Sequence, residues 1–179
     1  MATNVYGVEA FEYVAPSADG SMPTTGFKKV SPIADEAVTL NIPAAAVNNI
    51  RAQDVPGIYE VLPGDTDPAE MQVSQLQVNG QTVVDMLGGT WDSVTKRYDA
   101  PAIDVINKMA VRLTSKPLNG KKMYFWIRKG AVISNIAVQF VRNDLVKVGF
   151  TVRAVTPIDP DGVPQSPWGF QEIDVVQTT

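Results

Sequence analysis

The sequence of 179 residues contains no cysteine and no histidine. Without thiols there is no disulfide and no thiolate nucleophile, and without imidazoles there is no histidine base and almost no zinc or iron site. No apolar run approaches the roughly 20 residues that a membrane-spanning helix needs. Residues 1–16 also lack the basic flank and apolar core of a secretory signal. We therefore expect a protein that is made and folded in a cytoplasm and needs no cofactor.

Motifs of catalysis and phosphate binding are missing as well, since there is no G-x-x-x-x-G-K-S/T, no G-x-G-x-x-G and no G-x-S-x-G. The carboxylates close enough in sequence for acid/base catalysis are Asp35 with Glu36, Asp65 with Asp67, and Asp159 with Asp161. All lie among turn-forming residues, where Asp hydrogen-bonds its own backbone. Asp159 resembles the first ligand of a calcium loop, but the later ligands are missing. We expect no enzyme and assign no catalytic or metal-binding residue.

The chain does contain a strong β pattern. Apolar and polar residues alternate in four segments of its second half, residues 108–114, 121–129, 136–140 and 146–152. Asn119-Gly120 is a typical hairpin turn between the first two segments, and residues 142–144 are the expected turn between the last two. Further candidate strands are residues 4–14, 27–33 and 37–42, the last two broken by Pro32 and by the acids at 35 and 36. The sequence therefore predicts a single, mainly β domain over residues 1–179, an antiparallel sandwich or partial barrel.

One short helix is predicted between Asn79, a suitable N-cap, and the helix stop Gly88-Gly89. Its apolar stripe is Val83, Met86 and Leu87. A helix of about two turns is unstable alone in water, so it must dock on the sheet. Just before it, the alternation in residues 71–78 slips between residues 74 and 75, which predicts a β-bulge.

Two segments fit no regular pattern. Residues 43–70 are rich in proline, their acids outnumber the single base Arg51, and only residues 57–62 suggest a strand. Long irregular segments in compact domains commonly bind something, so we interpret residues 43–70 as an interaction arm. Residues 157–179 are interpreted as a proline-rich C-terminal extension with a candidate edge strand over residues 170–176.

The net charge is −4, and the charges are unevenly distributed. All bases except Lys28, Lys29 and Arg51 lie in residues 96–153, and the tail after them carries only acids. This asymmetry is expected either for head-to-tail contacts between copies or for a solvated sheet face. Tyr124 and Trp126, which alternate with bases along their strand, either stack on a ligand or are covered by protein.

Several short motifs then follow one another in a recognisable order. They are residues 38–43 (VTLNIP), residues 50–54 (IRAQD), residues 86–90 (MLGGT), and the turn residues Asp92, Thr95, Lys96, Tyr98, Ala100 and Pro101. In this order and spacing, over most of residues 27–157, the chain resembles the major tail tube proteins of long-tailed bacteriophages.

The resemblance implies a β-sandwich or barrel with one helix whose copies assemble into hexameric rings. The rings stack into a tube, the arm and the termini bridge neighbouring rings, and DNA passes through the lumen during ejection without specific binding. The implied partners are other copies of the chain and the tape measure, terminator and distal tail proteins, with no membrane involved. The implied location is the virion tail, after assembly in the host cytoplasm.

Self-assembly is expected to use the arm and the turn after the helix. The candidate interface residues are Asp54, Tyr59, Glu60, Asp65, Asp67, Trp91 and Tyr98, and Trp91 and Tyr98 are expected to pack on a neighbouring copy. A neutral or acidic lumen lets DNA slide, because bases would hold its phosphates. The basic strand faces should therefore turn away from the lumen or be offset by acids, and their bases are Lys108, Arg112, Lys147 and Arg153.

Two alternatives remain open. An inner tube subunit of a contractile injection or secretion device would share the same architecture. A monomeric β-sandwich that binds a carbohydrate or another ligand would instead use Tyr124, Trp126 or Trp91 as a stacking platform.

Overall fold

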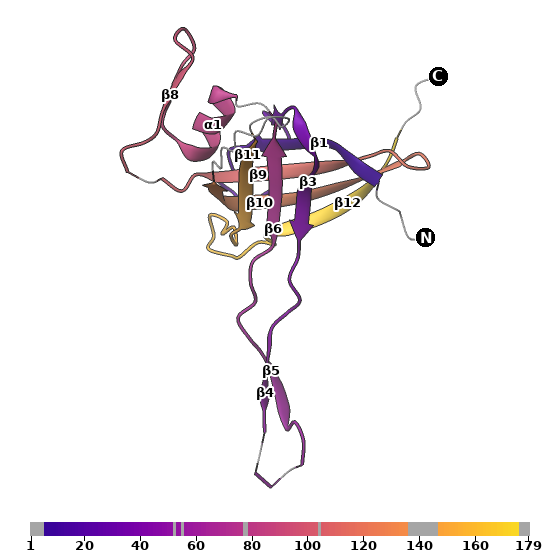
Figure 1. Ribbon diagram of the computed structural model, residues 1–179. Helices are drawn as coiled ribbons and strands as arrows, with labels where there is room; N and C mark the ends of the chain where they lie inside the picture. Colours follow the sequence, from indigo (N-terminus) through magenta and orange to yellow (C-terminus); the bar gives the residue numbers. More distant parts are fainter. Residues whose placement is uncertain are drawn as a thin grey trace, which may run out of the picture.

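The computed structural model describes residues 6–51, 53–54, 56–76, 79–103, 105–135 and 147–175. In these ranges the chain folds into twelve β-strands and a single α-helix, which confirms the predicted mainly β class. Figure 1 shows a curled sheet, a helix with a small hairpin at one end, and a long arm at the opposite end. No helix in the described part of the chain is long and apolar enough to cross a membrane.

The main sheet has eight strands, and all its pairs are antiparallel. Seven of them follow in the order β2 (Lys28–Val30), β1 (Tyr6–Val14), β9 (Lys108–Lys116), β10 (Lys121–Asn135), β11 (Val148–Ala154), β6 (Glu70–Gln75) and β3 (Ile33–Asn41). The eighth strand, β12 (Trp168–Asp174), also pairs with β10. The outermost strands β2 and β3 are separated in the chain only by Ser31 and Pro32. The sheet therefore curls back on itself and forms the nearly closed, antiparallel barrel that the sequence predicts.

β10 is the longest strand and has three partners. Residues 121–127 pair with β12, residues 130–135 pair with β11 after it, and β9 pairs with residues 124–131. The register with β9 shifts between Ile127 and Gly130, as at a bulge. A Cβ atom on Gly130 would lie 2.3 Å from Cγ1 of Val152, so only glycine lets β11 approach this closely.

The strand predicted over residues 121–129 therefore continues to Asn135, because an irregular register bends a strand without ending it. The next predicted strand, residues 136–140, and the predicted turn at residues 142–144 lie outside the described residues. The antiparallel pairing with the last strand of the predicted meander is present between β10 and β11. The Asn119-Gly120 turn is confirmed: it joins β9 to β10, and both residues have positive φ, 52° and 76°.

The hydrophobic core lies inside the barrel. Its largest fully buried apolar side chains are Phe11, Val30, Met71, Val73, Val83, Met86, Val111, Ile127, Val148, Phe150 and Val152. The predicted inner face of the last strand is confirmed, because Val148, Phe150 and Val152 alternate with more exposed residues. Burying each such side chain stabilises the fold by roughly 1.5–3 kcal/mol relative to leaving it exposed.

The predicted bulge in the strand before the helix is wrong. β6 alternates regularly from Glu70 to Gln75, its pairing with β11 has no register shift, and the shift in its pairing with β3 comes from extra residues in β3, between Ile33 and Val38. The apolar pattern slips because the inward position at the end of the strand belongs to a polar residue, Gln75. Its amide nitrogen donates a 2.8 Å hydrogen bond to the Ser31 carbonyl oxygen at the corner between β2 and β3.

Helix α1 (Gly80–Leu87) has the caps and the apolar face that the sequence predicts. The Asn79 carboxamide oxygen accepts hydrogen bonds from the backbone N–H groups of Gln81, at 3.0 Å, and Thr82, at 3.4 Å. Gly88 ends the helix with φ +81°, and its N–H donates to the Val84 carbonyl oxygen at 2.8 Å. Val83 and Met86 are buried in the core and Leu87 packs against it, so the helix docks on the barrel as expected.

The aromatic-rich turn after the helix forms a small hairpin of β7 (Thr90–Asp92) and β8 (Arg97–Asp99). The Asp92 carboxylate organises the turn, because it accepts the Thr95 hydroxyl at 2.7 Å and the Val94 N–H at 2.8 Å. These hydrogen bonds, led by the one from Thr95, lower the pKa of Asp92. Lys96 completes the turn with φ +57°.

The arm is inserted between β3 and β6 and contains a second hairpin, β4 (Val47–Ile50) paired with β5 (Glu60–Pro63). β5 confirms the second half of the strand suggested for residues 57–62, whereas β4 was not predicted. The predicted break at residues 35 and 36 is wrong, because β3 runs from Ile33 to Asn41 and absorbs the irregularity as a register shift against β6. Figure 1 shows the arm extending well beyond the barrel.

The C-terminal segment returns to the barrel. β12 pairs with the first half of β10 over Trp168–Asp174, close to the predicted edge strand. In the loop before it, Asp159 accepts hydrogen bonds from the backbone N–H groups of Asp161, at 3.0 Å, and Val163, at 2.8 Å. Asp159 therefore stabilises a turn, as the sequence context predicts.

Candidate functional site

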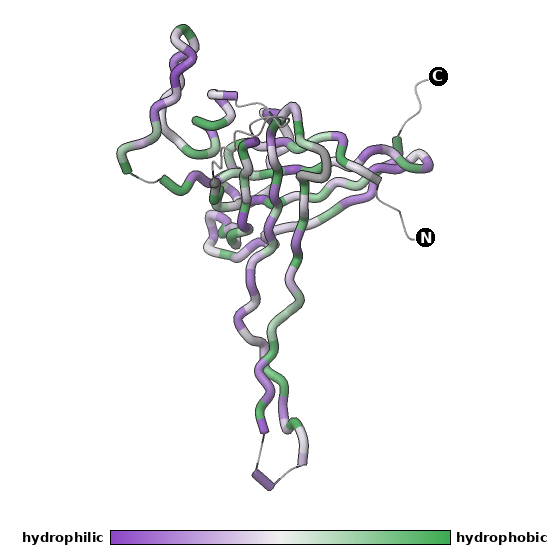
Figure 2. The backbone as a smooth tube through the Cα atoms, in the orientation of Figure 1, coloured by the Kyte–Doolittle hydropathy of each residue, from purple (hydrophilic) through white to green (hydrophobic). Residues whose placement is uncertain are grey.

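The arm carries a dense group of exposed apolar side chains. Single exposed apolar residues are normal on protein surfaces, but a group of them marks a surface that another molecule covers. The large hydrophobic residues exposed on the arm are Ile42, Val47, Ile50, Ile58, Tyr59, Val61 and Leu62, with Tyr59 64% and Val61 54% exposed. Figure 2 shows hydrophobic stretches in green along both sides of the arm.

These side chains lie on both faces of the arm. Residues that pair across antiparallel strands share a face, and successive residues alternate between faces. One face carries Val47 with Pro63 and Asn49 with Val61, and the other carries Asn48 with Leu62 and Ile50 with Glu60. A two-stranded hairpin is at best marginally stable alone in water. A partner that stabilises the arm therefore has to cover both faces.

The arm is also acidic. The predicted interface residues Asp54, Tyr59, Glu60, Asp65 and Asp67 all lie on it, and all are exposed. The structure thus brings the five arm residues of the predicted interface onto one protrusion.

At the base of the arm the acid Glu70 is paired. Arg153 Nε of the neighbouring strand β11 donates a 2.6 Å hydrogen bond to Glu70 Oε1. The two side chains line a small cleft together with Asn41, Pro43 and Asp67. The charge of the base is therefore partly neutralised, and Asp54, Glu60 and Asp65, which form no ion pair with a described residue, lie further along the arm.

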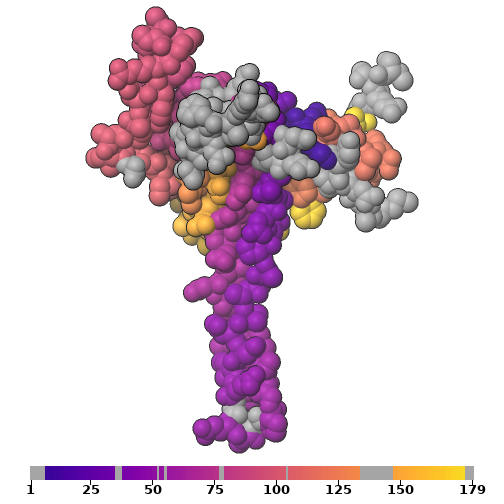
Figure 3. Space-filling model, in the orientation of Figure 1, coloured from indigo at the N-terminus to yellow at the C-terminus, as the bar shows by residue number. Residues whose placement is uncertain are grey.

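A second group of exposed apolar residues lies at the opposite end of the molecule. It comprises Val94 at the tip of the β7–β8 hairpin and Ile103, Val105 and Ile106 in the following loop, with Val94 87% and Ile103 79% exposed. Figure 3 shows this part of the chain, in pink, protruding at the upper left while the arm extends downward. We call Val94, Lys96, Ile103, Val105, Ile106 and Lys108 the helix-end surface.

The loop of the helix-end surface is fixed to the barrel at Asn107. Its side-chain amide donates to the Asp85 carbonyl oxygen of α1 at 3.1 Å, and its own carbonyl oxygen accepts the Val132 N–H of β10 at 2.9 Å. The neighbouring apolar residues Ile103, Val105 and Ile106 are exposed although Asn107 holds the loop on both α1 and β10. The fold therefore keeps these apolar side chains on the surface.

Trp91 and Tyr98, the two remaining predicted interface residues, contact their own chain. The Trp91 ring lies on Gly80 at the start of α1, where a Cβ atom would come within 2.0 Å of Cδ2 of the ring. The Tyr98 hydroxyl donates a 3.1 Å hydrogen bond to the Gly88 carbonyl oxygen at the end of α1. Both side chains are only half-buried. Their main contacts hold the hairpin on the helix, and a contact with a neighbouring copy stays a prediction.

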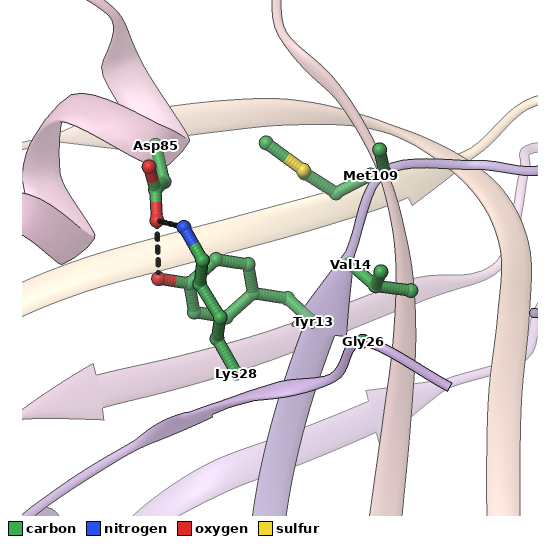
Figure 4. A pocket seen from close by; sticks show the side chains of 7 residues that line it. Tyr13, Val14, Gly26, Lys28, Asp85 and Met109 are labelled. Carbon is green, nitrogen blue, oxygen red and sulfur yellow. Dashed lines mark hydrogen bonds and ion pairs between the residues drawn. The ribbon is translucent and has the colours of Figure 1, made fainter. Parts of the chain in front are cut away.

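A cleft of about 330 Å³ with a mainly apolar lining and a polar cluster at Asp85 lies beside the helix (Figure 4). Asp85 of α1 accepts hydrogen bonds from the Tyr13 hydroxyl at 2.9 Å and from Lys28 Nζ at 2.6 Å through the same oxygen, Oδ2. Gln81 donates to its other oxygen at 3.0 Å. Burial opposes the charge of Asp85, but the hydrogen bonds from Lys28, Gln81 and Tyr13 outweigh burial and lower its pKa.

This arrangement does not resemble a catalytic acid–base pair. Both carboxylate oxygens of Asp85 accept hydrogen bonds. Burial raises the pKa of the Tyr13 phenol to about 12; the contact with Asp85 raises it as well, whereas a hydrogen bond with Thr82 lowers it. A phenol with this pKa stays protonated at neutral pH. The cluster therefore stabilises the docking of α1 on β1 and β2. No group of three or more His, Cys, Asp or Glu side chains in the described residues could hold a metal ion.

Two bases of the strand faces, Arg112 and Arg153, are paired with acids of other strands. Arg112 donates to Glu12 Oε2 through Nε at 3.0 Å and through Nη2 at 2.8 Å. Its guanidinium also lies 4.3 Å from the centre of the Phe27 ring and 5.2 Å from that of Tyr124. Together with the pairing of Arg153 with Glu70, this gives two of the four bases an acid of another strand, while the position of the lumen stays a prediction.

The two aromatic residues of this face are engaged with their own chain. Tyr124 lies beside Arg112, and the Trp126 ring packs on Gly169 of β12, where a Cβ atom would come within 2.8 Å of the ring. Both side chains are half-buried. These contacts favour the interpretation as aromatic residues covered by protein over that as an open stacking platform.

Sequence reasoning missed the apolar part of the candidate interface. It selected acids and aromatic residues, whereas the arm exposes Val47, Ile50, Ile58, Val61 and Leu62. These aliphatic residues could have been found as a hydrophobic group inside a proline-rich segment. The exposure of Ile103, Val105 and Ile106 has no comparable signal, because it depends on how the loop lies on the helix.

No protein-family model matches the chain, and no curated protein is significantly similar to it. Its function is therefore inferred from the resemblance of its motifs and from the geometry described above.

Proposed function

We propose that the chain is the structural subunit of a self-assembling tube, like the major tail tube proteins of long-tailed bacteriophages. In this proposal its copies form hexameric rings, the rings stack, and the tube is the channel for DNA ejection. The protein acts without catalysis. Its partners are further copies of itself and, at the ends of the tube, the tape measure, terminator and distal tail proteins.

The observation that carries this proposal is the arm, which exposes apolar side chains on both faces outside a complete core. A monomeric protein gains nothing from such a protrusion, because exposed apolar hairpins promote association. The nearly closed barrel also suits assembly into a ring. Its sheet leaves few open strand edges that could pair wrongly with another copy. The arm and the helix-end surface lie at opposite ends, as head-to-tail assembly requires.

The charge pattern supports passage of DNA. Arg112 and Arg153 are paired with Glu12 and Glu70, so these bases do not present isolated positive charge to phosphates. A lumen lined by such pairs would bind DNA weakly, because few counterions are released on contact.

The test is electron microscopy of the purified protein by negative staining, together with sedimentation velocity at increasing concentration. We expect rings or long tubes of uniform width. A monodisperse monomer at high concentration would contradict the proposal.

A variant without the arm separates assembly from folding. Gly64 N–H donates to the Ala46 carbonyl oxygen at 2.8 Å, so an Asn-Gly turn in place of residues 47–63 can close the hairpin at this pair. We expect this variant to keep the barrel, judged by circular dichroism, and to lose tube formation. Tubes from the armless variant would show that the arm is not an assembly element.

A further inference from the structure

We propose that the arm of one copy docks on the helix-end surface of another copy. This inference rests on the proposed function and names the surface that receives the arm. The two elements are the two groups of exposed apolar residues that protrude from opposite ends of the molecule (Figures 1 and 3).

The first argument is complementarity in polarity. Each partner offers aliphatic side chains of similar size: Val61 and Leu62 on the arm, and Ile103 and Ile106 on the helix-end surface, all exposed. Bringing them together removes apolar area from water on both sides, at roughly 25 cal/mol for each Å². In the part of the chain that the structure describes, both groups stay exposed.

The second argument is complementarity in charge. The arm carries the exposed acids Asp54, Glu60 and Asp65, and none of them forms an ion pair with a described residue. On the helix-end surface, Lys96 and Lys108 are exposed and likewise make no ion pair with a described residue, while the exposed Asp92 of the same hairpin is hydrogen-bonded within its own turn. Opposite charges around an apolar contact speed association and exclude wrong registers.

The third argument is geometry. A contact between two different surfaces of the same chain is heterologous, and it continues from copy to copy as a ring or a filament. Because the arm and the helix-end surface lie at opposite ends, repetition of this contact extends the assembly along one direction. A stack of layers grows in this way. Both faces of an arm can be covered if the arm inserts between the helix-end surfaces of copies in the next layer.

Crosslinking tests the contact directly, because the chain has no cysteine of its own. The double variant Val61→Cys with Ile106→Cys is treated with a bis-maleimide crosslinker under assembly conditions. We expect a ladder of covalent oligomers on denaturing gels, since every copy carries one arm and one receiving surface. The matched control is Val61→Cys with Val163→Cys, because Val163 is 52% exposed but lies in the C-terminal loop. This control should give at least tenfold less crosslinked product.

The outcomes distinguish the two proposals. Tubes of the double variant without a ladder, or with equal ladders in test and control, would overturn the docking surface and leave the tube function standing. Absence of any assembly in the unmodified chain would overturn the tube function itself.

A charge exchange tests the same contact if the cysteine variants assemble poorly. Lys96→Glu with Lys108→Glu should slow assembly several-fold, and adding Asp54→Lys with Glu60→Lys should restore it. Failure of the second pair to restore assembly, in chains that keep their circular dichroism spectrum, would contradict the docking.

Discussion

The Trp91 ring lies so close to the Cα atom of Gly80 that a Cβ atom there would come within 2.0 Å of the ring carbon Cδ2. The β7–β8 hairpin is thus fixed at its first strand by the contact of Trp91 with Gly80 and at its second by the hydrogen bond from Tyr98 to Gly88. This contact orients the tip of the hairpin, which belongs to the helix-end surface.

The Gly80→Ala substitution should therefore lower the free energy of unfolding by about 1–3 kcal/mol, because the rigid ring has to move. In a Trp91→Ala background the same substitution should be neutral or slightly stabilising, since alanine is the better helix former. Urea unfolding of the four chains measures this coupling. Equal effects of Gly80→Ala in both backgrounds would show that the overlap is relieved elsewhere.

Capping of the helix should be measurable at Asn79. Asn79→Ala removes the acceptor for two backbone N–H groups, and we expect it to lower the free energy of unfolding by about 1 kcal/mol. Asn79→Asp keeps an oxygen in the same place and should retain most of the stability. Chemical denaturation of the three proteins is the measurement, and equal midpoints for the alanine and aspartate variants would refute the role of the cap.

Acid should destabilise the barrel partly through Asp85. Its folded pKa is lowered, so the unfolded chain binds the proton more readily. The stabilisation is therefore complete above the ordinary pKa of about 3.9 and is lost as the pH falls through the lowered value. Urea unfolding is measured between about pH 6 and about pH 2, a range that includes this pKa. Over this range the free energy of unfolding should fall less for Asp85→Asn than for the unmodified chain. Parallel curves for the two chains would contradict this prediction.

The buried amide of Gln75 offers a sharper test of the corner between β2 and β3. Gln75→Glu replaces the donor to the Ser31 carbonyl oxygen by a buried carboxylate, and we expect a loss of about 2 kcal/mol or more at neutral pH. Burial should raise the pKa of the new carboxyl group, so stability should recover as the pH falls and the group becomes a donor again. Gln75→Leu is the control, because it has no titratable group and should show no such recovery.

Local chemistry explains which elements the sequence predicted. The helix was found correctly because its start at Asn79, its stop at Gly88 and its apolar stripe are all encoded within ten residues. The alternating strands β9 and β11 were found because one of their faces is consistently buried. The Asn119-Gly120 turn fixed the pairing between β9 and β10.

Features that depend on distant residues were not predictable in this way. The inward position of Gln75 depends on a carbonyl oxygen 44 residues away in the sequence. β4 contains two adjacent asparagines and becomes a strand only through its pairing with β5. Nothing in the sequence indicates that Gly80 leaves room for the Trp91 ring, so the contact of Trp91 with its own helix was not predicted. Five of the residues predicted for the interface do lie together on the arm, where their role in assembly stays a prediction, and the exposed aliphatic residues beside them were not selected from the sequence.

The insertion point of the arm sets a rule for its length. Asn41 and Glu70 are paired neighbours at the ends of β3 and β6. The arm is therefore joined to the barrel at two adjacent positions. Adding two residues to each arm strand lengthens the arm by about 7 Å and returns every side chain to its original face, whereas adding one residue exchanges the two faces. The reach of the arm can therefore change only in steps, and a spacing between successive layers built on it would be quantised by the pleat of a β-strand.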